Sequence, residues 1–183
     1  MAKRLLILVD VQKDFDKGGA LPYGYPEKSN TEAICDLAEE FLGNGDFIIA
    51  TRDTHEEGYL ETLEGKMLPV KHCVRNTRGW NLVDRLDRMY CRGELCIVDK
   101  PTFGSLDLCK AIAEIQRSEG VFIDEIHIAG FCTSICVAAN AIILRAQNPD
   151  NRIILHKDLC GDINKESHEA ALSVLKNQQI EIV

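Results

Sequence analysis

The sequence contains no long hydrophobic run, since no stretch approaches the roughly 20 apolar residues that a membrane-spanning helix needs. Nor does the N-terminus carry the longer apolar core and small-residue cleavage site of a secretory signal. Its apolar run at residues 5–9 ends at Asp10. We therefore expect a cytoplasmic protein that has no membrane partner.

Basic and aromatic residues are also scarce. The chain has 21 Lys and Arg against 29 Asp and Glu, for a net charge of −8, and only 6% of its residues are aromatic. Nucleic-acid-binding proteins need basic side chains against phosphates and aromatic side chains against bases, so the composition argues against a nucleic-acid partner. Because the G-x-x-x-x-G-K-[ST] phosphate loop is missing and no G-x-G-x-x-G motif follows the first apolar run, nucleotide hydrolysis and a dinucleotide cofactor are disfavoured.

Cysteine pairs with C-x-x-C spacing are absent, although the chain has eight cysteines. This absence weakens the zinc-ribbon and thioredoxin-like interpretations. Disulfide frameworks are typical of small secreted chains. We therefore expect most of these thiols to be buried and reduced.

The sequence does contain a repeated alternation of strand and helix patterns. Residues 29–32 form a capping-box pattern ahead of the first helix, and residues 53–79 show no period and are expected to be a long functional loop. Strands are predicted at residues 5–9, 47–50, 95–98, 122–129, 152–156 and 179–183, and helices at 33–42, 80–90, 106–117, 134–145 (apolar on nearly all sides, hence buried) and 165–176. This pattern predicts one α/β domain over residues 1–183, with a mostly parallel six-stranded sheet and helices on both faces.

The carboxyl ends of the predicted strands carry the residues capable of chemistry. Ligands of such sheets bind beyond these ends. Asp10 follows the first strand, Lys100 the third, and a turn containing Cys136 the fourth. Thr133 could cap the next helix and place Cys136 in its first turn, where the helix dipole favours a thiolate. Lys100 would lower the thiol pKa further, and Asp10 could take and return the proton. The alternative is an unreactive buried cysteine beside an ordinary strand-end Asp and Lys.

A candidate metal site follows the second strand. Asp53 and His55 are two residues apart and would point the same way in an extended chain. His72 lies near the end of the long loop, and Glu64 lies between them in the sequence. Two imidazoles with carboxylates are suitable ligands for zinc, iron or manganese.

These residues lie in segments that together resemble the isochorismatase-like cysteine hydrolases, in particular the nicotinamidase-like branch. The resemblance covers nearly the whole chain. It rests on residues 10–15 (DVQKDF), 51–55 (TRDTH), 68–74 (LPVKHCV), Lys100 and 130–137 (GFCTSICV). It implies a catalytic triad of Asp10, Lys100 and Cys136.

The resemblance also implies a metal site and an oxyanion hole. Asp53, His55 and His72 would hold a divalent metal, usually zinc, with Glu64 as a fourth ligand in some members. A cis peptide would precede Cys132, and the backbone N–H groups of Cys132 and Cys136 would form the oxyanion hole.

The substrate pocket is expected to include Phe15, Leu68 and Phe131. Phe15 matches the aromatic residue that flanks the substrate ring in the family. Leu68 stands where nicotinamidases usually have an aromatic side chain, which leaves the identity of the amide more open than the triad.

The function that we predict is hydrolysis of nicotinamide to nicotinate and ammonia through a Cys136 thioester, with the ring nitrogen on the metal and a role in NAD salvage. One alternative is a related hydrolase of another small amide or N-carbamoyl compound. A metal-free relative acting on isochorismate is disfavoured by the cysteine. A non-catalytic binding protein, or a thiol-based metal or redox module, is the alternative of another class. Because family members are often oligomeric, a homo-oligomer is a further expectation.

Overall fold

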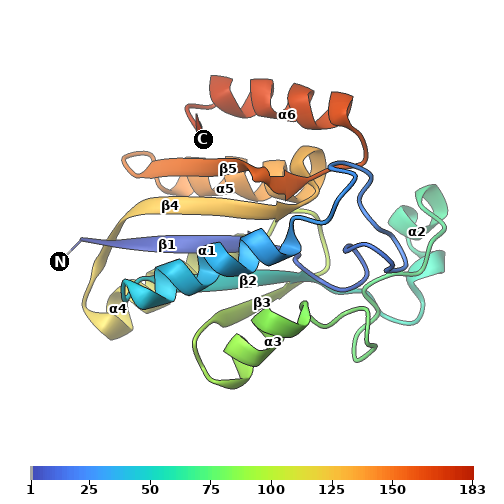
Figure 1. Ribbon diagram of the computed structural model, residues 1–183, viewed down its shortest axis with the longest axis horizontal. Coiled ribbons are helices and arrows are strands. Elements are labelled where there is room, and N and C mark those ends of the chain that lie inside the picture. Colours follow the sequence, from blue (N-terminus) through green and yellow to red (C-terminus); the bar gives the residue numbers. More distant parts are fainter. Residues whose placement is uncertain (1) are drawn as a thin grey trace.

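A six-stranded sheet of parallel strands forms the centre of the molecule, in the order β3-β2-β1-β4-β5-β6 (Figure 1). The computed structural model describes residues 2–183. The strands are β1 (Ala2–Val9), β2 (Phe47–Asp53), β3 (Cys96–Lys100), β4 (Phe122–Phe131), β5 (Arg152–Gly161) and β6 (Glu181–Ile182). The predicted α/β fold is confirmed, and every pairing between these strands is parallel.

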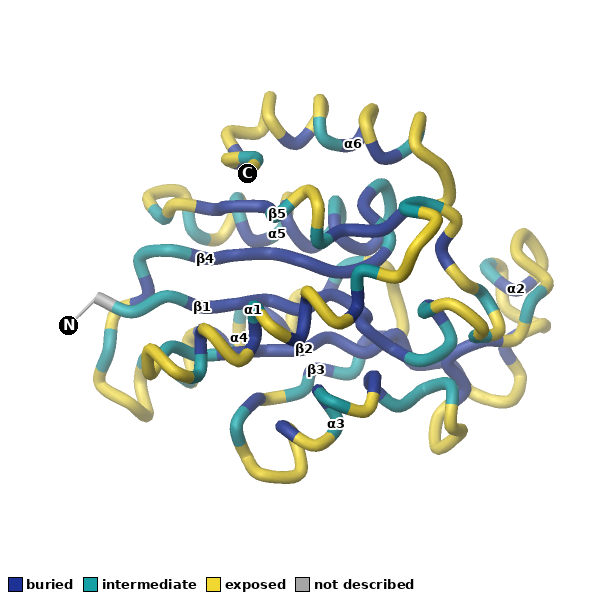
Figure 2. The backbone as a smooth tube through the Cα atoms, in the orientation of Figure 1, coloured by how far each residue is buried: buried dark blue, intermediate teal, exposed yellow. Residues whose placement is uncertain are grey.

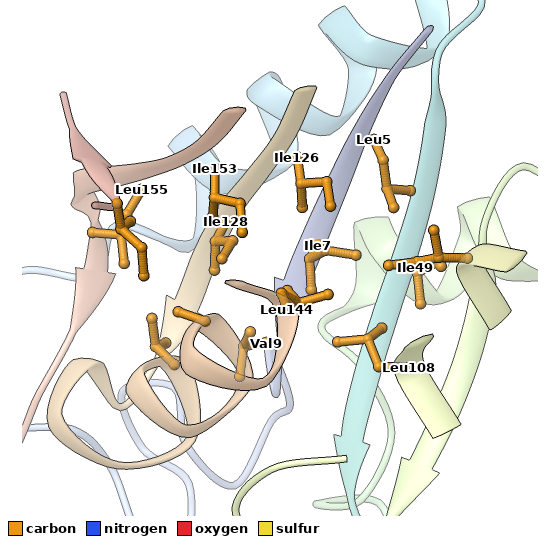
Figure 3. Packing of buried hydrophobic residues seen from close by; sticks show 14 of the residues in the cluster. Leu5, Ile7, Val9, Ile49, Leu108, Ile126, Ile128, Leu144, Ile153 and Leu155 are labelled. Atoms are coloured by element: carbon orange, nitrogen blue, oxygen red, sulfur yellow. The ribbon is translucent and has the colours of Figure 1, made fainter. Parts of the chain in front are cut away.

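Helices cover both faces of the sheet, as the alternating pattern predicted. One hydrophobic cluster lies between the sheet and α4 (Leu106–Glu119), α5 (Ala138–Gln147) and α6 (Lys165–Asn177). Figure 3 shows Ile7 of β1, Leu108 of α4 and Leu144 of α5 within this cluster. A second cluster lies against α1 (Thr31–Gly43) and α3 (Asp84–Cys91). The central strands are therefore buried along most of their length (Figure 2).

Several local predictions differ from the structure. The capping box is wrong, because Asn30 occupies the N-cap position of α1 without a side-chain cap, while Ser29 Oγ donates a hydrogen bond to Asp16. Helix α3 begins at Asp84 rather than at residue 80, because Leu82 pairs with Gln12 in an isolated bridge. These differences arise from tertiary contacts that compete with local propensity.

The helix predicted over residues 134–145 is also different. Thr133–Val137 form a π-helical turn, and α5 begins only at Ala138. Ile142 is 42% exposed, so the helix is not buried on all sides. The long loop contains a 3-10 turn at Tyr59–Glu61 and the short helix α2 (Leu63–Met67).

The ends of β1 and β4 approach each other closely at Gly130. Gly130 has a φ of +129°, and a Cβ atom there would lie 2.1 Å from the carbonyl oxygen of Val9. Only glycine allows this backbone conformation and this approach. The residue after Val9 is therefore held beside the turn that follows β4. Within residues 2–183, no helix has the length and apolar character needed to cross a membrane.

Candidate active site and metal centre

Lys100 lies at the centre of the polar groups at the carboxyl ends of the strands. Its side chain is fully buried, and its Nζ lies 2.6 Å from Asp10 Oδ2 and 3.5 Å from Cys136 Sγ. The same nitrogen is 3.7 Å from Asp53 Oδ1. The ends of β1, β2 and β3 and the turn after β4 thus bring the three residues of the predicted triad together beside a predicted metal ligand.

Asp10 is held in one orientation by its neighbour on β2. Thr51 Oγ1 donates a hydrogen bond of 2.6 Å to Asp10 Oδ1, and the Asp10 backbone N–H donates to the same hydroxyl oxygen. Burial raises the pKa of the Asp10 carboxyl, and the Lys100 charge opposes that rise. The carboxylate is therefore a stronger base than an exposed aspartate, which suits a proton acceptor.

Cys136 lies in the π-helical turn, and its burial opposes the thiolate that the helix dipole and Lys100 were expected to favour. Burial raises the pKa of its thiol well above the usual range, the Asp10 charge raises it further, and Lys100 only partly opposes both. Thr133 is not the predicted cap, because its hydroxyl donates to Gly161 O and contacts His168 Nδ1 instead. A thiol whose pKa is raised in this way needs a base before it can act as a nucleophile.

The turn that carries Cys136 is held from both sides. The Asp162 carboxylate accepts hydrogen bonds from the backbone N–H and the hydroxyl of Ser134, both at 2.8 Å. Asn140 Nδ2 donates to the carbonyl oxygen of Cys136 at 2.8 Å. The peptide bond between Phe131 and Cys132 is cis, as the resemblance implied.

Asp53, His55 and His72 form a compact group of possible metal ligands. One ligand atom from each lies within 4.8 Å of the others, and all three residues are buried. His55 Nε2 is 3.0 Å and His72 Nε2 is 3.4 Å from Asp53 Oδ2. Glu64 Oε1 is 3.6 Å from His55 Nε2 but lies outside this compact trio. The three main predicted ligands are therefore together, with Glu64 beside them.

The chemistry of this group fits a divalent cation. His55 Nε2 is buried and has no hydrogen-bond partner among the residues that the structure describes. His72 Nδ1 lies 2.8 Å from the carbonyl oxygen of Val70, which orients the ring with Nε2 toward Asp53. Burial works against ionisation of Asp53, but the adjacent imidazoles of His55 and His72 and the Lys100 charge hold its pKa below the usual range. An ionised carboxylate beside two imidazole nitrogens is a suitable ligand set for zinc, iron or manganese.

A mostly apolar cavity of about 280 Å³ lies in front of both groups. Phe15 and Leu68 line it, as predicted, whereas Phe131 does not. Phe131 is fully buried and its ring stacks on Tyr23 with the centroids 4.4 Å apart, so its substrate-contacting role is corrected to a packing role. The lining consists of Phe15, Leu21, Pro22, Tyr23, Gly24, Asp53, Glu64, Leu68, His72, Phe103, Cys132, Ile135, Cys136 and Ile163.

Sequence reasoning missed two residues that shape the metal group. Gln12 is fully buried, its Oε1 accepts from Asp53 N at 2.7 Å, and its Nε2 donates to Asp53 O at 2.9 Å. The ring of Tyr59 packs beside both His55 and His72, and its hydroxyl donates to Leu68 O. Gln12 lies in the motif after β1, but nothing in that motif indicates its partner on β2.

Comparison with known proteins agrees with this geometry. The isochorismatase domain family model matches residues 4–183. An uncharacterised isochorismatase family protein of Bacillus subtilis, PncA, is 34% identical over 183 residues, covering 96% of this chain and 95% of that protein. The crystal structure of nicotinamidase PncA from Bacillus subtilis gives a TM-score of 0.82 at 29% identity and covers 99% of each chain. The pyrazinamidase of Pyrococcus horikoshii in complex with zinc gives 0.79 at 30% identity, covering 99% of this chain and 98% of that one.

Proposed function

The chain belongs to the isochorismatase family, and on this premise we propose that it is a nicotinamidase-like amidohydrolase that converts nicotinamide to nicotinate and ammonia. The observation that carries this proposal is the position of Lys100, whose Nζ contacts Asp10, Cys136 and Asp53 together. It joins a base and a nucleophile to the candidate metal centre at one cavity. The similarity to proteins named nicotinamidase and pyrazinamidase supports a carboxamide substrate.

Proton transfer between Asp10 and Cys136 begins the reaction. Burial raises the pKa of Asp10 and so makes its carboxylate a better acceptor for the Cys136 proton than an exposed aspartate would be. Lys100 stays positively charged, since its pKa is raised by Asp10, Cys136 and Asp53 despite burial. The ammonium therefore stabilises negative charge on either Asp10 or Cys136.

The thiolate then attacks the amide carbon and forms a tetrahedral oxyanion. Cys132 and Cys136 both line the cavity, and we propose that their backbone N–H groups stabilise this oxyanion. Asp10 returns its proton to the departing nitrogen, and ammonia leaves. Water then hydrolyses the Cys136 thioester, which releases nicotinate and restores the thiol.

Asp53, His55 and His72 would hold a divalent metal, for which zinc is the proposed ion, and Glu64 lies close enough to His55 to assist. When bound, the ion would supply a Lewis-acidic position for a ring nitrogen. Phe15 contributes a flat apolar wall next to it, since its ring centroid lies 5.5 Å from that of His72.

The lining of the cavity favours a neutral ring amide over an N-carbamoyl amino acid. Neither lysine nor arginine is among the residues that line it, within the described part of the chain, and the ionisable side chains there include Asp53 and Glu64. No cationic side chain there would replace the hydration that the carboxylate of an N-carbamoyl amino acid loses on entry. An uncharged aromatic carboxamide loses little hydration in the same place.

The test is ammonia release from nicotinamide by the purified protein, with pyrazinamide and N-carbamoylglycine measured alongside. We expect release from both ring amides and none from N-carbamoylglycine. Cys136→Ala should abolish release, whereas Cys91→Ala, which changes an exposed thiol, should not alter it. Activity that survives in Cys136→Ala would refute the assigned nucleophile.

Metal content distinguishes the role of the catalytic residues from that of the metal ligands. By elemental analysis, Cys136→Ala should retain the metal of the wild type, and His55→Ala should lose it together with activity. Loss of metal in Cys136→Ala but not in His55→Ala would assign the ion to cysteine instead. A wild-type protein with stoichiometric metal and no ammonia release from ring amides would leave the metal site standing and reject the substrate.

A further inference from the structure

Asn140 lies on α5, one turn after Cys136, and its side chain connects three separate backbone groups. Its Nδ2 donates to Cys136 O at 2.8 Å and to Phe103 O at 3.1 Å. Its Oδ1 accepts from Ser105 N at 3.0 Å. The residue is fully buried. The bonds to Phe103 and Ser105 connect α5 to the loop between β3 and α4, which lies about 35 positions earlier in the sequence.

This loop, residues 101–105, forms part of the cavity wall through Phe103. The Phe103 side chain lines the cavity and is 48% exposed, so it has the position of an entrance residue. Gly104 lies directly on α5, because a Cβ atom there would lie 2.6 Å from Ile143 Cδ1 and 3.2 Å from Ala139 Cβ. The two bonds from Asn140 reach the residues on either side of Gly104. They therefore hold the loop against the helix on both sides of this tight contact.

We propose that Asn140 is a positioning residue that sets the width of the substrate entrance by holding Phe103 against α5. The proposal rests on the proposed amidohydrolase function. The nucleophile turn depends less on Asn140 than the loop does, because Asp162 also binds Ser134 and the N–H groups of Ile135 and Val137 donate to Cys132 O. Loss of Asn140 therefore acts on substrate binding and selectivity more than on the chemical step.

The expected result for Asn140→Ala is a rise in KM for nicotinamide of about five- to tenfold, with kcat changed less than about threefold. Because the entrance widens, the ratio of kcat/KM for the bulkier quinoline-3-carboxamide to that for nicotinamide should increase. Phe103→Ala should give the same change in selectivity. In the Phe103→Ala background, Asn140→Ala should add less than about twofold to KM.

Asn148→Ala is the matched control. Asn148 Nδ2 donates to Leu144 O at 2.9 Å, which is the same type of bond to the carbonyl four residues earlier on the same helix, away from the loop. It should leave KM and selectivity unchanged even where it lowers the melting temperature. An unchanged KM and selectivity in Asn140→Ala, or independent effects of Asn140→Ala and Phe103→Ala that multiply in the double variant, would overturn the proposal. If Asn140→Ala does not fold, Asn140→Ser is measured by the same criteria.

A readout without substrate separates this inference from the proposed function. Alkylation of Cys136 by iodoacetamide, followed by peptide mapping, reports access to the nucleophile even if the wild type does not hydrolyse nicotinamide. Asn140→Ala and Phe103→Ala should increase the alkylation rate to a similar extent, and Asn148→Ala should not. Equal rates in all four proteins would reject the entrance role, whatever the substrate is.

Discussion

Replacement of Lys100 by methionine removes the ammonium that contacts Asp10, Cys136 and Asp53, while it keeps most of the aliphatic stem. The Asp10 side chain is fully buried and that of Asp53 nearly so. Removal of one partner from a buried ion pair costs about 3–5 kcal/mol, because the other charge stays buried without compensation. For a chain of this size, 1 kcal/mol corresponds to about 2–4 °C in melting temperature. Lys100→Met should therefore melt roughly 6–20 °C below the wild type.

The loss of stability in Lys100→Met should depend on pH. Burial raises the pKa of Asp10 even with Lys100 present, and without that cation the rise is unopposed. The folded variant then binds a proton at Asp10 at a higher pH than the unfolded chain, whose carboxyl titrates near 3.8. Its stability therefore increases as the pH falls through the raised folded-state pKa. The stability deficit of Lys100→Met relative to the wild type should narrow between pH 7.5 and pH 5.

Urea unfolding at both pH values, with ammonia release from the same samples, measures the effect. Lys110→Met is the matched control, because Lys110 Nζ lies 2.6 Å from Asp107 Oδ1, the same distance as in the buried pair, but at the surface. It should change the unfolding midpoint little. Asp10→Asn combined with Lys100→Met should recover part of the loss. A Lys100→Met variant as stable as the wild type, or a deficit that does not depend on pH, would refute the reasoning.

Three further changes test contacts at the site and elsewhere in the sheet. Gln12→Ala leaves the buried backbone N–H and C=O of Asp53 without their partner, so it should cost about 1–3 kcal/mol in urea unfolding and lower the metal content; an unchanged midpoint would contradict the clamp. Gly130→Ala requires a side chain at a φ of +129° against a backbone oxygen and should lower stability by more than about 2 kcal/mol, so a wild-type melting temperature would argue against the close approach. His127 Nδ1 of β4 lies 2.9 Å from His156 Nε2 of β5, and burial lowers the pKa of both rings. Because the unfolded chain protonates first, His156→Gln should flatten the loss of stability as the pH falls below 6.5, and an identical pH profile in urea unfolding would exclude this pair as a source of acid sensitivity.

The strand ends show why so much of the site could be predicted from the sequence. Asp10 and Lys100 each follow a short apolar strand, and the carboxyl ends of parallel strands meet at one edge of a sheet. Once the alternation of strands and helices indicates a parallel sheet, the neighbourhood of these residues follows. The i and i+2 spacing of Asp53 and His55 places both side chains on one side, because side chains alternate along an extended chain.

The residues that were wrong or missed depend on contacts that the local sequence does not contain. Phe131 stacks on Tyr23, more than 100 positions away, so its ring does not line the cavity. Gln12 and Asn140 each bind backbone groups on distant segments, and no spacing rule connects them. An amide side chain near a strand end or a helix start has no preferred partner until the fold supplies one.

By itself, the sequence determined the fold class, the edge of the sheet that carries the site, and the residue types that meet there, because periodicity and strand ends are local properties. Only the tertiary structure decided how strongly Cys136 is buried. The helix dipole and Lys100 favour a thiolate, but burial removes solvation that a thiolate needs and raises the pKa of the thiol. Burial is a property of the whole packed chain, so its effect on the Cys136 thiol appears only when the chain is folded, whereas Asp10 could be predicted as the base from its place at a strand end.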